Sequence, residues 1–78
     1  MLDERNTKVK FGNFIKEGRE RKHLYQSQVA ESVNISQQYY SQIENGIRNV
    51  DLVLAMKICE SLHLSLNDFI KMYQNETP

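Results

Sequence analysis

The stretch that decides the fold is residues 26–46, QSQVAESVNISQQYYSQIENG. Apolar residues recur with helical spacing on either side of an Asn-Ile-Ser segment at residues 34–36. Asn tolerates the left-handed backbone that ends a helix, and Ser is a favoured residue for capping the start of one. The stretch therefore predicts two short helices, about 26–33 and 37–45, joined by a tight turn that Ile35 fills.

The second of these helices has two chemically different faces. Tyr40 and Ile43 form an apolar side, and the opposite side consists of uncharged polar residues: Gln37, Gln38, Ser41 and Gln42. A glutamine amide carries a donor and an acceptor, so it can grip adenine at N6 and N7 with two hydrogen bonds. We interpret this side as a surface that reads base edges. The alternative is a solvated helix face that happens to be rich in glutamine.

The remainder of the chain predicts an all-α domain without strands. Helical spacing of apolar residues indicates five short helices, at about 8–22, 26–33, 37–45, 52–62 and 66–73. One domain would span 8–74, after a flexible N-terminus at 1–7 and before a tail at 75–78. His23 and His63 stand where helices should stop, and histidine visits the left-handed region more often than most residues. We expect both to serve as helix C-caps.

Composition narrows the class of protein. The chain has 78 residues, of which 40% are hydrophobic and 26% charged, as expected for a globular domain. No apolar run approaches the ~20 residues of a membrane span, and no signal peptide is visible, so we expect no membrane association. The single cysteine, Cys59, cannot form an internal disulfide, which favours a reducing cytoplasm.

Net charge is zero, but the charges are unevenly distributed. Residues 1–25 hold seven Lys and Arg against four acids, whereas residues 26–78 hold three against six. The basic bias therefore precedes the predicted helix pair, where it would favour a nucleic-acid partner. The alternative is an ordinary solvated surface.

No catalytic or metal-binding pattern is present in the sequence. His23 and His63 are 40 residues apart, and Cys59 falls on the apolar side of a predicted helix. There is no Gly-rich phosphate loop and no paired Cys/His spacing. We expect no enzyme activity, no metal, no cofactor and no small-molecule ligand.

Residues 9–70 resemble the phage-repressor-type helix-turn-helix family, which includes lambdoid repressors, Cro proteins and restriction–modification controller proteins. The matching residues are Gln26, Val29-Ala30, Ile35-Ser36, Tyr40, Ile43-Glu44, Gly46 and Arg48-Asn49. The run 36–46 is especially similar to phage repressors that read DNA with glutamines. The resemblance implies a lambda-repressor-like domain that binds double-stranded DNA.

The resemblance also implies roles for individual residues. Gln37, Gln38 and Gln42 would read bases, with Ser41 beside them. Contacts to the DNA backbone would come from Gln26, Tyr39, Asn45 and Arg48. Arg19 and Glu44 would form an ion pair between the first and third helices. Three positions depart from the pattern: Tyr25 replaces the usual Ser or Thr cap, Val50 replaces a common Pro, and Gly18 replaces a core Leu whose space Phe14 or Tyr25 would fill.

Specific DNA binding by so small a module usually requires a dimer, because pairing doubles the contact. The last predicted helix carries more apolar residues than a small core needs, which makes it the expected homodimer contact through Leu66, Phe69, Ile70 and Tyr73. The sequence thus predicts a dimeric transcriptional regulator on a palindromic operator, a repressor or a controller protein. The alternatives are the DNA-binding antitoxin of a toxin–antitoxin pair and, less favoured, an RNA-binding module.

Overall fold

The computed structural model describes residues 3–75 and, within them, contains five α-helices and no strand. The helices are α1 (Glu4–Arg21), α2 (Gln26–Ser32), α3 (Gln37–Glu44), α4 (Leu52–Ser61) and α5 (Leu66–Asn75). The prediction of an all-α fold with five short helices is confirmed. Residues 1, 2 and 76–78, assigned to the N-terminus and the tail, lie outside the described residues. No helix in the described part is long and apolar enough to cross a membrane.

The start of the first helix was wrongly predicted. Residues 4–7 belong to α1 rather than to a flexible segment. The Asp3 side chain caps the helix by accepting from the Arg5 backbone N–H at 3.0 Å. Asn49 Nδ2 donates to Glu4 Oε1 at 3.3 Å, and Thr7 Oγ1 lies 3.5 Å from the Tyr73 hydroxyl. The first turn is therefore held by segments distant in sequence, which local propensity does not reveal. At the other end of the chain, α5 extends to Asn75, two residues beyond the predicted end.

Four helices end in the same way, with one residue in the left-handed conformation. These residues are His23 (φ 58°), Asn34 (φ 61°), Gly46 (φ 73°) and His63 (φ 56°). After each, the next backbone N–H reaches back five residues, as in the bond from Leu64 N to Cys59 O at 2.7 Å. This is the Schellman arrangement, which satisfies carbonyls left open at a helix end. The predicted capping roles of both histidines are confirmed.

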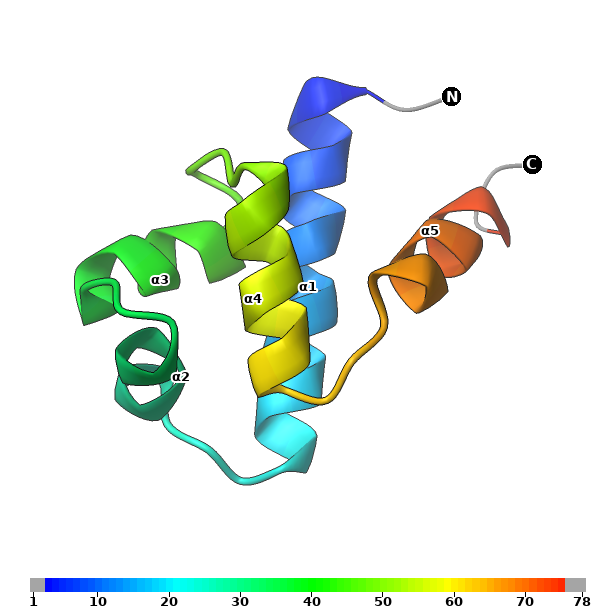
Figure 1. The fold of residues 1–78 in the computed structure, drawn as a ribbon. Coiled ribbons are helices and arrows are strands. Elements are labelled where there is room, and N and C mark those ends of the chain that lie inside the picture. The colour runs from blue at the N-terminus through cyan, green and yellow to red at the C-terminus, as the bar shows by residue number, and fades with distance from the viewer. Residues whose placement is uncertain (1–2, 76–78) are drawn as a thin grey trace.

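The core is centred on α1, with α2 and α3 on one side and α5 on the other (Figure 1). Phe11 and Phe14 of α1 contact Phe69 of α5, with ring centroids 5.3 Å and 5.4 Å apart. Tyr73 extends this cluster, 6.0 Å from Phe69. Phe69 and Tyr73 are each 5% exposed. Two of the four residues predicted for a dimer contact therefore serve to hold α5 on its own chain.

Two glycines of α1 allow other segments to approach closely. A Cβ on Gly12 would lie 2.6 Å from the Ile43 carbonyl oxygen and closer still to that of Glu44, so the end of α3 rests on the α1 backbone. A Cβ on Gly18 would lie 2.5 Å from Leu64 Cδ1. Leu64, from the segment after α4, thus occupies the space expected for Phe14 or Tyr25. Tyr25 instead points to solvent, 74% exposed.

Candidate nucleic-acid interface

The helix-turn-helix geometry comes from the turn between α2 and α3. Ser36 Oγ accepts the Tyr39 backbone N–H at 3.0 Å, which caps the start of α3. Half-buried Ile35 packs against the core between the two helices. Tyr40 and Ile43 are 0% and 1% exposed, so they fix which side of α3 faces inward. The polar side of α3 is thereby left on the surface.

The polar residues of α3 gather on one open surface. A shallow depression is lined by the side chains of Gln26, Gln37, Gln38, Ser41 and Gln42. Gln37 and Gln38 are exposed, whereas Ser41, Gln42 and Gln26 are half-buried. None of the five is charged. The structure brings all four predicted base-reading residues together with Gln26, and their roles in reading DNA stay predictions.

Behind this surface, a buried ion pair joins α1 to α3. Arg19 Nε donates to Glu44 Oε2 at 2.6 Å, and Arg19 Nη2 donates to Glu44 Oε1 at 3.0 Å. Gln26 Nε2 also donates to Glu44 Oε1, at 3.0 Å. The carboxylate therefore joins the end of α1, the start of α2 and the end of α3. Because the Arg19 charge is neutralised here, it adds little to the positive field at the surface.

Burial and hydrogen bonding have opposite effects on the pKa of the Glu44 carboxyl. Burial alone would raise its pKa, but the hydrogen bonds, led by those from Arg19, outweigh burial and hold the pKa below its ordinary value. The hydrogen bond to Glu44 raises the pKa of Arg19. Tyr40 lies beside the pair, and burial raises the pKa of its phenol. The buried Tyr40 hydroxyl interacts with the Glu44 carboxylate and helps to hold the Glu44 pKa down, although the two groups do not meet the geometry of a regular hydrogen bond.

Gln26 has a second hydrogen available for a partner outside the chain. Its amide nitrogen carries two hydrogens, of which Glu44 takes one. The expected contact to a phosphate uses the other. The hydrogen bond to Glu44 was missed from the sequence, since it joins residues of two helices that only the fold brings together.

The turn after α3 carries a second feature that the sequence did not reveal. Arg48 Nε donates to Gln42 Oε1 at 3.0 Å, and its guanidinium carbon lies 4.6 Å from the centre of the Tyr39 ring. The Schellman turn at Gly46 reverses the chain and makes this contact possible. Asn45, the C-cap of α3, is exposed beside it. Of the residues predicted to meet the DNA backbone, Arg48 thus lies beside Tyr39 and Gln42, and Asn45 stands at the C-terminal end of α3.

Known proteins support this assignment of the fold. The chain matches the helix-turn-helix family over residues 15–69. It is 39% identical over 70 residues to the control protein C.MunI of a Mycoplasma species. The aligned residues cover 88% of this chain and 95% of that protein. It is 34% identical over 64 residues to the uncharacterised HTH-type transcriptional regulator YqaF of Bacillus subtilis, and the aligned residues cover 82% of this chain and 84% of that protein.

Among solved structures, the chain is similar to the restriction–modification controller protein C.AhdI of Aeromonas hydrophila. The TM-score is 0.78 at 31% identity, over 87% of this chain and 99% of that one. The clp gene regulator ClgR of C. glutamicum gives a TM-score of 0.78 at 25% identity, over 81% of each chain. The family match and these relatives agree with the geometry of α2, the turn and α3. The chain belongs to the helix-turn-helix family of DNA-binding transcriptional regulators.

Proposed function

We propose that the protein is a sequence-specific regulator that binds a palindromic operator as a homodimer and controls a restriction–modification system. Sequence-specific reading of DNA is supported by one observation: the exposed side of α3 has an uncharged surface made by Gln37, Gln38, Ser41 and Gln42. A helix of this kind offers its first turns and one face to the major groove. The names of C.MunI and C.AhdI, a control protein and a controller protein, support the role in a restriction–modification system.

Each residue of the surface has a role suited to its chemistry. Gln37 and Gln38 are exposed in the first turn of α3, where base edges are within reach. The two can use both amide atoms, whereas Ser41 supplies a short hydroxyl. Gln26, Asn45 and Arg48 flank the reading positions and contact phosphates, which fix the register of the helix on the duplex.

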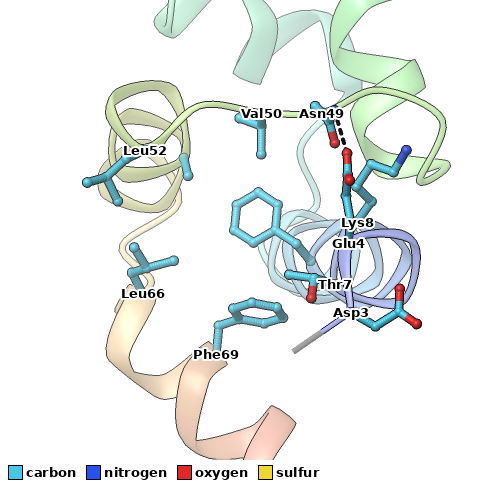
Figure 2. Close-up of a pocket in the computed structure, with 11 residues that line it drawn as sticks. Asp3, Glu4, Thr7, Lys8, Asn49, Val50, Leu52, Leu66 and Phe69 are labelled. Atoms are coloured by element: carbon cyan, nitrogen blue, oxygen red, sulfur yellow. Dashed lines mark hydrogen bonds between the residues drawn. The ribbon is translucent and has the colours of Figure 1, made fainter. Parts of the chain in front are cut away.

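The dimer part of the proposal rests on apolar side chains that the monomer leaves exposed. They lie on α4 and α5: Leu52, Val53, Met56, Ile70 and Met72. An apolar groove of about 360 Å³ is lined in part by Leu52 of α4, and Figure 2 shows Leu52, Leu66 and Phe69 around it. In Figure 1, α5 is on the side of the molecule away from α3. A second copy on this face buries the groove and leaves both α3 helices free for DNA.

The dimer contact proposed here differs in membership from the sequence-based one. Ile70 and the half-buried Leu66 remain in it, and Leu52, Val53 and Met56 of α4 join them. Phe69 lines the groove, and Tyr73 is buried beside Phe69, with ring centroids 6.0 Å apart. Pairing of this kind doubles the DNA contact of a module too small for tight binding alone.

Selection of bound sequences from random duplex DNA tests the proposed function. The expected result is an enriched palindrome whose half-sites are about one helical turn apart, ~10 base pairs. Binding that enriches no sequence, at low salt and with folded protein, would contradict specific reading. Enrichment of a single non-palindromic half-site would contradict the dimer alone.

A further inference from the structure

The contact between Arg48 and Gln42 constrains how Gln42 meets a base. Every polar hydrogen-bonding group of an arginine side chain is a donor. The Gln42 atom 3.0 Å from Arg48 Nε must therefore be the carbonyl oxygen, whichever way the amide is oriented elsewhere. The Gln42 NH2 group then occupies the other corner of the planar amide, away from the guanidinium.

Two further contacts hold Arg48 in this position. Its guanidinium lies over the Tyr39 ring, 4.6 Å from the ring centre, which favours a flat, stacked arrangement. Its own backbone N–H approaches the backbone carbonyl oxygen of Gln42 at 3.4 Å. The side chain is thus guided by an aromatic platform on α3 and by the turn that follows it. Within the described part of the chain, no side-chain hydrogen bond of this kind holds Gln37 or Gln38, and both are exposed, so their amides are free to rotate.

We propose that Arg48 is a positioning residue that engages the carbonyl oxygen of Gln42, so that Gln42 reads the operator as a hydrogen-bond donor. This inference rests on the proposed function, because it refines what one reading position selects. A free glutamine prefers adenine, where it accepts from N6 and donates to N7. A donor-only amide instead favours guanine, which offers the adjacent acceptors N7 and O6. The N6 amino group of adenine would face the Gln42 NH2 group, donor against donor.

As a consequence, the three glutamines of α3 do not all select the same base. Gln37 and Gln38 keep the ordinary preference for adenine, whereas Gln42 selects guanine. Arg48 thereby affects specificity without contacting a base. A residue that only neutralised a phosphate would change affinity uniformly across sequences and leave the base preference intact.

The test compares selected sequences for the wild type, Gln42→Ala and Arg48→Met. Gln42→Ala identifies the base pair that Gln42 reads, as the position whose preference is lost. At that position the wild type is expected to favour guanine over adenine by roughly fivefold or more, the scale of a base contact. Arg48→Met removes the donor but keeps an unbranched side chain. It is expected to shift the preference towards adenine by a similar factor.

Lys57→Met is the matched control, since it removes one positive charge from an exposed position of α4, outside the turn after α3 that carries Arg48. It is expected to leave the preference at the Gln42 position unchanged. Adenine preferred by the wild type at this position would overturn the proposal, as would an Arg48→Met profile that differs from the wild type only in overall affinity. A wild type that enriches no sequence at all would instead contradict the proposed function, so the two failures are distinguishable.

Discussion

Glu44 is 3% exposed and still carries its charge, because Arg19 and Gln26 together donate three hydrogen bonds to it. A carboxylate with a folded-state pKa below its ordinary value of 4.5 stabilises the folded chain above that value. The contribution is lost as pH falls from 4.5 through the lower folded pKa. Removing one partner alone leaves the other charge buried, which typically costs about 3–5 kcal/mol.

Glu44→Gln is therefore expected to lower the free energy of unfolding at pH 7 by about 3 kcal/mol. It should also flatten the loss of stability as pH falls below 4.5, since the group that gains a proton there is gone. Urea unfolding across this pH range measures both effects. Arg19→Met and the double variant complete a cycle, and strictly additive losses would show that the two side chains do not interact.

The histidines at helix ends give a second prediction at this scale. His63 holds a φ of 56°, a region in which a Cβ is unfavourable by about 1 kcal/mol and glycine is not. His63→Gly is expected to raise the melting temperature by about 4–8 °C for a domain of this size. His63→Ala keeps the Cβ and removes the imidazole, so it should give no rise. An equal rise in both variants would show that the imidazole, not the backbone, was the unfavourable feature.

Among the elements, the position of α3 depends on how closely it approaches α1. The carbonyls of Ile43 and Glu44 lie over Gly12, where no Cβ fits between them and the α1 backbone. Because backbone atoms lie on both sides of this contact, no flexible side chain can move to make room for a Cβ. At Gly18 the close atoms belong to the Leu64 side chain, which can rotate.

Gly12→Ala is expected to destabilise the fold by about 3 kcal/mol, despite the better helix propensity of alanine, because overpacking must displace α3. Gly18→Ala is the matched control and should change the free energy of unfolding by less than about 1 kcal/mol, since Leu64 can move. Thermal and urea unfolding of the two variants measure the difference. Equal effects would mean that the approach of α3 is not what Gly12 permits.

At the scale of the whole molecule, substitution of the exposed apolar residues of α4 and α5 tests whether the protein is a monomer or a dimer. Leu52 and Ile70 are 66% and 44% exposed, so each can be replaced by lysine without opening the core. Leu52→Lys and Ile70→Lys are expected to convert a dimer to a monomer in sedimentation experiments at micromolar concentration. Ile47→Lys, at 67% exposure in the turn after α3, is the control and should stay dimeric. A wild type that sediments as a monomer would contradict the proposed dimer.

Much of this molecule follows from local signals in the sequence. Ser36 and Asp51 cap helix starts through their own short side chains, and Asn34 ends α2 with a left-handed backbone, so those boundaries were predicted to within a residue or two. The polar side of α3 was readable because Tyr40 and Ile43 fix the opposite side. These features depend on residues three or four apart.

Most features that the sequence did not reveal join distant segments; the contact between Arg48 and Gln42, six residues apart, depends instead on the turn after α3. The first turn of α1 is held by Asn49 and Tyr73, and Leu64 fills the space above Gly18. The burial of Phe69 depends on Phe11 and Phe14 of α1. An amphipathic pattern on α5 shows that one side must be covered, but not whether its own chain or a second copy covers it.

The central claim, that exposed glutamines of α3 read a specific DNA sequence, is tested most directly at Gln38. Binding of the selected operator and of single-base variants is measured for the wild type and Gln38→Ala at several salt concentrations. The account predicts that Gln38→Ala weakens operator binding by about 10-fold or more, relaxes preference at one symmetric pair of positions, and leaves the salt dependence unchanged. Equal affinity and equal base preference in the two proteins would contradict it.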